Sequence, residues 1–223
     1  MCGRFTLHHT WAEIHDQLSV FKGTHEGRNL GARYNIAPTQ DVLFAHTDQD
    51  GQVHVKEGRW WLVPHWAKEL QSKYPMFNAR SEDAEKKPAF REAYKTGRCL
   101  IPASGYYEWT KGEDGKKDPW LLHLPDTPPF VFAGLWTHNK ALDVTSCTVM
   151  TAAAAPEIEH IHNRMPIVLK AEAHATWLDC SLPVEDAKAA LAENHGSELQ
   201  AYRVGWQVNS SKTDEASMIE PIR

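Results

Sequence analysis

Residues 98–109 read Arg98-Cys99-Leu100-Ile101-Pro102-Ala103-Ser104-Gly105-Tyr106-Tyr107-Glu108-Trp109. The first five residues form a largely apolar run that is typical of a buried strand, and the rest leads into a second strand rich in aromatic residues. A charged turn that contains glycine follows over residues 110–118. Further strands are expected at 120–124 and 130–137, separated by a proline-rich loop. Strands that follow one another through short turns favour antiparallel pairing.

The same pattern continues on both sides of this stretch. It predicts strands at residues 2–7, 42–45, 53–60, 144–151, 167–169 and 199–204, with 33–38 as the entry to the strand at 42–45. Helices are expected at 10–18, where Thr10 and Glu13 form a capping box, and at 82–94, 156–161, 171–178 and 184–193. Pro88 lies inside the second helix and should kink or split it. The sequence therefore predicts an α+β fold: a single domain over 1–223, with a mainly antiparallel, barrel-like β core and peripheral helices.

Composition narrows the class of protein. The chain has 223 residues, 42% of them hydrophobic, which is enough to bury a substantial core. Its net charge of −5 argues against a uniformly basic surface, although a local basic patch could still bind nucleic acid. No apolar run is long enough to span a membrane, and no leader-like segment precedes Cys2, so a cytoplasmic location is expected, nucleoid-associated if the source is bacterial. The cysteines lack paired spacing, which favours free thiols over zinc binding: Cys2, Cys99, Cys147 and Cys180.

The second residue offers unusual chemistry. Met1 should be removed because cysteine is small, which would leave the α-amine and the thiol of Cys2 on adjacent carbons. An amine condenses with an aldehyde to an imine, and the thiol can then close a five-membered thiazolidine ring. The alternative is that Cys2 is simply a small residue at the start of a strand.

Three other positions carry candidate chemistry. Glu108 sits among aromatic residues, where burial would raise its pKa and suit it to proton transfer, unless the strand turns it toward water. His162 lies two residues after His160, a spacing that does not bring both rings to one metal ion, so it is either a lone acid or base or a structural histidine. Trp66 follows two other tryptophans and precedes a polar run; it either stacks on unpaired bases or packs within its loop.

Several motifs, in order, resemble one family. They are Cys2-Gly3-Arg4-Phe5, Arg33-Tyr34-Asn35-Ile36-Ala37-Pro38, Asn78-Ala79-Arg80, Gly105-Tyr106-Tyr107-Glu108-Trp109 and His162-Asn163-Arg164-Met165-Pro166. Together they resemble the SOS-response-associated peptidase (SRAP) family, and the likeness extends to the ending Ile219-Glu220-Pro221.

The resemblance implies a sensor of abasic sites in single-stranded DNA that forms a covalent DNA–protein crosslink. The implied catalytic residues are Cys2 as nucleophile, Asn78, Glu108 and His162. The implied DNA-binding residues are Arg4, Asn35, Trp66, Arg80 and Arg164. Relatives often carry adjacent aromatic wedge residues where this chain has His65-Trp66, so the role of His65 is unassigned. No cofactor or metal is implied. The expected protein is a monomer whose partner is abasic single-stranded DNA.

The chemistry of these residue types agrees with that resemblance. His162 would help to open the abasic sugar, Glu108 would handle protons during imine formation, and Asn78 would bond the sugar oxygens. An imine also permits β-elimination, so an abasic lyase activity is compatible. Two alternatives stay open: a peptidase that uses the N-terminal Cys2, and a non-covalent binder of modified DNA.

Overall fold

The computed structural model describes residues 2–22, 24, 29–112 and 115–222, and the expected removal of Met1 lies outside them. The α-helices are α1 (Trp11–Gln17), α2 (Arg91–Thr96), α3 (Ala171–Leu178) and α4 (Val184–Ala192). Single 3₁₀ turns are η1 (Ser19–Phe21), η2 (Gly196–Glu198), η3 (Trp206–Asn209) and η4 (Ala216–Ile219). The strands are β1 (Phe5–Leu7), β2 (Arg33–Ile36), β3 (Asp41–Thr47), β4 (Val53–Trp60), β5 (Asn78–Arg80), β6 (Arg98–Ala103), β7 (Gly105–Lys111), β8 (Lys117–His123), β9 (Phe130–Asn139), β10 (Val144–Ala153), β11 (Arg164–Pro166), β12 (Val168–Leu169) and β13 (Gln200–Arg203).

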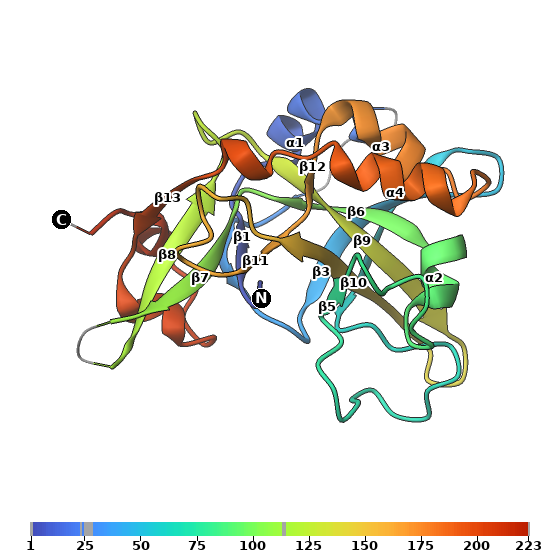
Figure 1. The fold of residues 1–223 in the computed structure, drawn as a ribbon, viewed down its shortest axis with the longest axis horizontal. Helices are drawn as coiled ribbons and strands as arrows, with labels where there is room; N and C mark the ends of the chain where they lie inside the picture. Colours follow the sequence, from blue (N-terminus) through green and yellow to red (C-terminus); the bar gives the residue numbers. More distant parts are fainter. Residues whose placement is uncertain (1, 23, 25–28, 113–114, 223) are drawn as a thin grey trace.

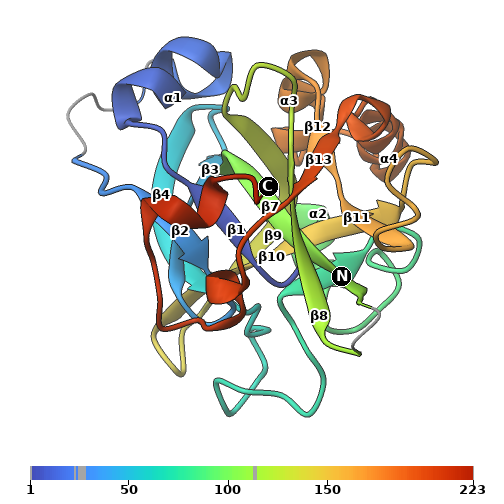
Figure 2. The same cartoon turned by 90° about the vertical axis from the view of Figure 1, so that its left-hand side faces the viewer.

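Strand β10 closes the larger sheet into a ring. It pairs with β4 on one side and with β9 on the other, and β3 and β6 complete the path between those two strands. β5 and β11 pair with the later part of β10, and β12 extends the sheet from β9. The pairings of β10 with β4 and β5 are parallel, and the others in this sheet are antiparallel. Figures 1 and 2 show this curved sheet with α3 and α4 packed on its outer side.

A second sheet has the order β13-β8-β7-β1-β2 and brings the N-terminal strand against the ring. Phe5 of β1 packs edge-on against Trp60 of β4 at 4.9 Å and against Phe132 of β9 at 5.7 Å between ring centroids. One buried apolar cluster therefore includes residues from both sheets. The expected α+β class and mainly antiparallel β core are confirmed.

Several predictions that rested on residues close together in the sequence are confirmed. The Thr10–Glu13 capping box is present, and β4 and α3 match their predicted ranges. Two predicted helices are wrong. Residues 81–90 form successive turns, and α2 begins only at Arg91, because Pro88 has no N–H to donate and its ring opposes a continuous helix. Residues 156–161 likewise form turns.

Another correction concerns residues 33–38. They do not merely lead into the next strand, because Arg33–Ile36 is itself β2 and pairs with β1. Among the described residues no helix is both long enough and apolar enough to cross a membrane. All four cysteines are free thiols.

Candidate functional site

The strand pair β1–β7 sets the position of the N-terminal residues. Phe5 lies opposite Tyr106, and the Tyr107 N–H donates to the Arg4 carbonyl at 2.9 Å. Continuing this antiparallel register places the segment that begins with Cys2 beside Glu108. Tyr106 and Glu108 share one face of β7 because side chains alternate along a strand. That face is turned toward the main apolar core, in which Tyr106 and Cys2 both lie.

Glu108 is a buried carboxylate at this position, with only 4% of its surface exposed. Burial raises its pKa, and the nearby charge of His162 opposes that rise. The raised pKa expected from the sequence is confirmed, and the alternative in which Glu108 faces water is wrong. A carboxyl group whose pKa is raised can exchange protons closer to neutral pH.

Cys2 is completely buried next to this carboxylate. Its thiol lies 3.8 Å from the Arg4 carbonyl oxygen, to which it donates. Burial, followed by the negative charge of Glu108, raises the pKa of the Cys2 thiol well above its ordinary value. The sulfur is therefore held as a neutral thiol in this state.

Asn78 holds the backbone of Cys2. Its Nδ2 donates to the Cys2 carbonyl oxygen at 2.7 Å. The residue is placed by β5, where it lies in parallel register opposite Val149 of β10. Its Oδ1 is buried without a hydrogen-bond partner among the described residues. An acceptor left in this way is costly unless a bound molecule supplies a donor.

His162 follows the turns at 156–161 and lies just before β11. The Arg164 N–H lies 2.9 Å from its Nδ1, which must accept because an N–H can only donate. In the neutral ring the proton is then on Nε2. The Arg164 carbonyl oxygen lies 3.1 Å from the same Nδ1, so a protonated ring also has a local partner.

Two arginines flank this region. Arg164 makes a bidentate contact with Glu82 at 2.5 and 3.0 Å, and it also donates to the Thr151 carbonyl at 2.7 Å. The Arg164 contact lowers the pKa of Glu82. Arg80 is exposed at the end of β5. Arg80 is accordingly available to an anion, whereas Arg164 would have to exchange part of its contact with Glu82.

Arg4 and Asn35 are hydrogen-bonded to each other, and both are bonded to the C-terminal segment. Arg4 Nη1 donates to Asn35 Oδ1 at 2.6 Å and to the Val208 carbonyl at 2.5 Å. Asn35 is 1% exposed, and its Nδ2 donates to the Ser210 and Thr213 carbonyls. The expected DNA contact by Asn35 stays a prediction, because in this structure the amide contacts only other parts of the chain. Its place in the structure is to fix Arg4 against the C-terminal segment.

Trp66 is 57% exposed on the long connection between β4 and β5, with the exposed His65 beside it. The turn that carries Trp66 is anchored by the buried Asn139. The Asn139 Nδ2 donates to the Pro64 and Ala67 carbonyls at 2.8 and 2.9 Å. This exposure leaves the Trp66 ring accessible to a base, as stacking would require. Asn139 was not predicted, because no local pattern links residue 139 to residues 64–67.

Tyr106 is a second residue that sequence reasoning missed. Its hydroxyl is buried without a hydrogen-bond partner among the described residues. Burial, then the charges of Cys2 and Glu108, raises its pKa well above the ordinary value, so the hydroxyl stays protonated beside the site. The sequence signal that could have found Tyr106 is its position two residues before Glu108, because residues two apart in a strand share one face.

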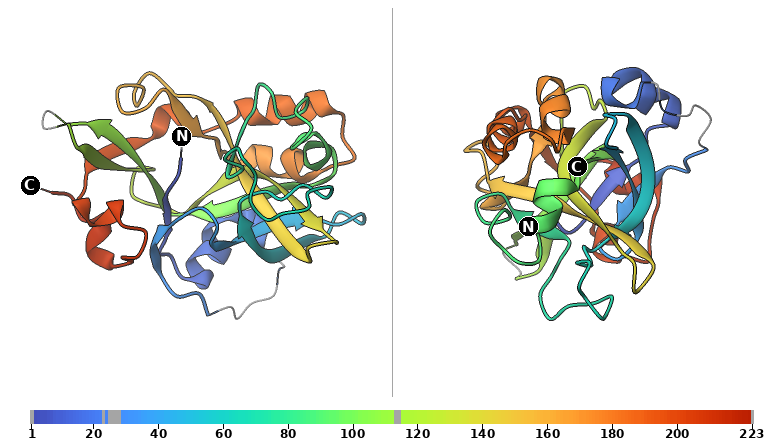
Figure 3. Two further views of the ribbon diagram at one scale, coloured as in Figure 1. Left: turned by 90° about the horizontal axis from the view of Figure 1, so that it is seen from below. Right: turned by 90° about the vertical axis from the view of Figure 1, so that its right-hand side faces the viewer.

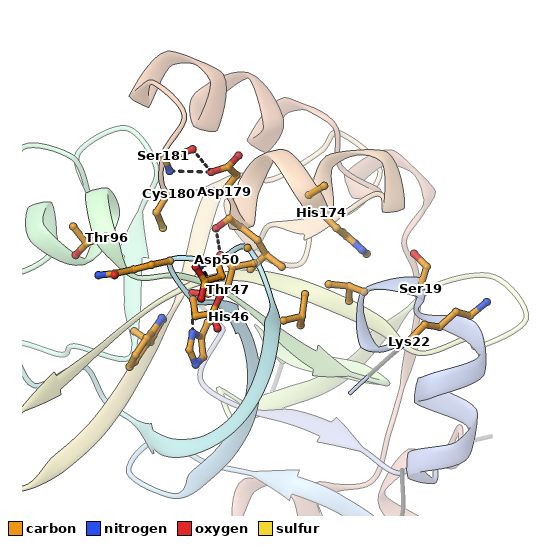
Figure 4. Close-up of a pocket in the computed structure, with 18 of the residues that line it drawn as sticks. Ser19, Lys22, His46, Thr47, Asp50, Thr96, His174, Asp179, Cys180 and Ser181 are labelled. Atoms are coloured by element: carbon orange, nitrogen blue, oxygen red, sulfur yellow. Dashed lines mark hydrogen bonds between the residues drawn. The ribbon is translucent and has the colours of Figure 1, made fainter. Parts of the chain in front are cut away.

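A separate cavity of about 1150 Å³ lies between the β3–β4 hairpin, η1 and α3. It contains the buried His46 and His174, whose pKa values are lowered by burial (Figure 4). None of the predicted site residues lines it. No group of three or more histidine, cysteine or acidic residues in the described part of the chain is arranged to hold a metal ion.

Comparison with known proteins gives a family match over nearly the whole chain. The family described as "SOS response associated peptidase (SRAP)" matches residues 1–211. The chain is 33% identical over 224 residues to the abasic site processing protein YoaM of Bacillus subtilis (strain 168), covering 99% of this chain and 98% of YoaM. It is 28% identical over 232 residues to the abasic site processing protein YedK of Escherichia coli (strain K12), covering 100% of both.

Solved structures show the same fold. A protein from Bordetella bronchiseptica matches with a TM-score of 0.76 at 25% identity, covering 92% of this chain and 100% of its own. A protein from Bacteroides thetaiotaomicron matches with a TM-score of 0.77 at 20% identity over 100% of both chains.

Proposed function

The chain belongs to the SRAP family, and from this membership together with the Cys2 site we propose that it captures abasic sites in single-stranded DNA as a covalent thiazolidine on Cys2. The observation that carries the proposal is the convergence of Asn78 and Glu108 on residue 2. Asn78 donates to the Cys2 carbonyl, and the charge of Glu108 acts on the Cys2 thiol. Relatives named as abasic site processing proteins support the choice of DNA substrate.

The first step is opening of the abasic sugar. The closed hemiacetal must lose its O–H proton and protonate its ring oxygen before an aldehyde appears. The protonated ring of His162 would supply the second proton from Nε2 while its Nδ1–H donates to the Arg164 carbonyl oxygen, and the O–H proton would pass to solvent. Asn78 Oδ1, which is otherwise unpartnered among the described residues, would accept from a sugar hydroxyl.

The covalent steps require the free amine that removal of Met1 would expose. The amine nitrogen attacks the aldehyde carbon to form a carbinolamine, which loses water to give an imine. The thiol sulfur then bonds to the imine carbon, and the thiol proton passes to the imine nitrogen. Glu108 can accept the proton released from the amine and return it to the departing hydroxyl, because burial raises its pKa.

The raised pKa of the Cys2 thiol supports this order of events. A neutral thiol is a weak nucleophile, so the amine is the group prepared to react first. Transfer of the thiol proton to the imine nitrogen then places a positive charge beside the sulfur, and the thiolate formed closes on the imine carbon. The sulfur therefore acts on the intermediate rather than on the closed sugar. If closure is slow, β-elimination from the imine would appear as lyase activity.

The test uses a single-stranded oligonucleotide that carries one abasic site. Wild-type protein should give a heat-stable band of higher mass on a denaturing gel, and intact mass should show Met1 removed and the adduct on the first residue. Oligonucleotides with uracil or with the tetrahydrofuran analogue, which has no aldehyde to expose, serve as controls and should give no band.

Two variants separate the amine from the thiol. Cys2→Ser should lose the heat-stable adduct but retain an imine that borohydride reduction traps. An extra uncleaved residue ahead of Cys2 should abolish both products. A heat-stable adduct with Cys2→Ala would overturn the nucleophile assignment, and peptide cleavage without any DNA adduct would favour the peptidase alternative.

A further inference from the structure

Trp206 is a large aromatic residue exposed near the Cys2 site. It begins η3, and 55% of its surface is accessible to solvent. The other strongly exposed aromatic residues among those described are Trp66 and Tyr74, which lie in the connection between β4 and β5. Figures 1 and 3 show that the dark red segment containing η3 and the teal connection containing Trp66 lie on opposite sides of β1 and β5.

A positive charge accompanies the Trp206 ring. The Lys116 ammonium lies 5.2 Å from the ring centroid, a distance typical of a cation–π contact. Lys116 precedes β8, where Lys117 pairs with Lys111 of β7. Burial raises the pKa of Glu108, and the charge of Lys117 is one of the smaller effects that oppose this rise, so the positive end of this hairpin lies within electrostatic reach of the site. Asp118, also at this end, is paired with Arg203 at 2.8 Å.

The segment that carries Trp206 is fixed to the same residues that position Cys2. Arg4 donates to the Val208 carbonyl of η3 at 2.5 Å. Trp109 of β7 donates through Nε1 to Asn209 Oδ1 at 2.6 Å, and the Arg4 guanidinium lies 6.0 Å from the Trp109 ring centroid. A continuous series of contacts therefore links Arg4 and the strand of Glu108 to the backbone of η3. An exposed ring held by such a scaffold loses little conformational freedom on binding.

From these contacts we propose that Trp206 and Lys116 form a second nucleotide-binding position, in which a base stacks on the indole and the ammonium contacts the phosphate backbone. A nucleotide of single-stranded DNA presents one flat ring and one negative charge, the two features that this pair matches. The inference rests on the proposed function and extends it: the strand is held on both sides of the captured sugar, by Trp66 on one side and by Trp206 on the other.

The test measures non-covalent binding, so that it does not depend on crosslinking. Fluorescence anisotropy gives the Kd of the full chain for a labelled oligonucleotide with a central tetrahydrofuran site. Trp206→Ala should weaken binding roughly 5- to 150-fold, the range for loss of one base–aromatic stack. Trp206→Phe should retain most of the affinity. Lys116→Ala should weaken binding and reduce its salt dependence, whereas Lys95→Ala, which removes an exposed lysine of α2, should do neither.

Truncated oligonucleotides locate the contact. One oligonucleotide ends directly 5′ of the tetrahydrofuran site and another ends directly 3′ of it. The effect of Trp206→Ala should vanish with one truncation, and the effect of Trp66→Ala should vanish with the other. Loss of both effects with the same truncation would overturn the proposal, as would a Trp206→Ala Kd within twofold of wild type on the full oligonucleotide.

Folding of the variants is checked by thermal unfolding. If Trp206→Ala does not fold, the difference in tryptophan fluorescence quenching between wild type and Trp206→Phe on adding the same DNA supplies the answer. An equal quench in the two proteins would contradict stacking at position 206. Failure of abasic crosslinking by the wild type, with these binding results intact, would count against the proposed function and leave this inference standing.

Discussion

Replacement of Asn78 gives the sharpest test of how residue 2 is positioned. In the structure Nδ2 bonds the Cys2 carbonyl at 2.7 Å, and Oδ1 is buried without a partner among the described residues. Asn78→Ala removes both atoms. The N-terminal residue then loses one tether, and the substrate loses one acceptor. Asn78→Asp keeps an acceptor but turns the donor into a second oxygen facing the carbonyl oxygen of Cys2.

The size of the effect follows from these two bonds. Each neutral hydrogen bond contributes about 0.5–1.5 kcal/mol net, so the loss of both raises the barrier by roughly 1–3 kcal/mol. A change of that size slows crosslinking by roughly 5- to 150-fold. Asn78→Asp should be slower than Asn78→Ala, because it adds oxygen–oxygen repulsion against the Cys2 carbonyl and brings a second carboxylate to the residue on which the charge of Glu108 already acts.

The assay is single-turnover crosslinking to an abasic oligonucleotide, quenched over time and read on a denaturing gel at several protein concentrations. The maximal rate should carry most of the loss, because the Asn78–Cys2 bond positions the nucleophile rather than the DNA. Tetrahydrofuran DNA provides the matching binding measurement. An Asn78→Ala rate within twofold of wild type, or an Asn78→Asp rate above that of Asn78→Ala, would refute the reasoning.

Three further variants test other features. Burial raises the pKa of Glu108. Between its ordinary and its raised pKa, the folded protein therefore binds more protons than the unfolded chain, and the free energy of unfolding falls as the pH rises through this range. Glu108→Gln should therefore melt at a higher temperature than wild type at about pH 7.5, show no such gain near pH 4, and crosslink more slowly; a lower melting temperature at about pH 7.5 would contradict this. Asn139→Ala leaves the Pro64 and Ala67 carbonyls without their buried donor and should cost about 1–3 kcal/mol in a denaturant titration while weakening DNA binding through Trp66. Thr39 has a φ of 78°, which strains a β-branched residue, so Thr39→Gly should stabilise the fold by about 1 kcal/mol in the same titration, and destabilisation would show that the turn is not strained.

The fold was predictable where short stretches carried their own signal. Thr10 and Glu13 cap each other, and the alternation within residues 53–60 marks a strand, so both elements formed as expected. β5 and β11 were not predicted as strands because each has three residues and exists through its pairing with β10. The helix expected from residue 82 failed because Pro88 outweighs the propensity of its neighbours.

The roles of the site residues stay predictions, and the sequence did not give their arrangement. Family motifs gave Cys2, Asn78, Glu108 and His162, and aromatic neighbours alone gave the raised pKa of Glu108. The burial of Asn35 could not be foreseen, because its partners lie about 175 residues away in the C-terminal segment. Long-range contacts of this kind leave no trace in the spacing of nearby residues.

The connection from β4 to β5 has consequences for how such a protein diversifies. The Leu62 N–H donates to the Met76 carbonyl at 3.1 Å, which closes the base of the loop, and β5 is aligned separately by its register with β10. Residues between these anchors can therefore change in length or sequence without displacing Asn78, because loop closure costs little more as a loop grows. Selection can thus alter the tip that carries Trp66, and under the proposed function the DNA structures that it favours, while the position of Asn78 beside Cys2 is kept.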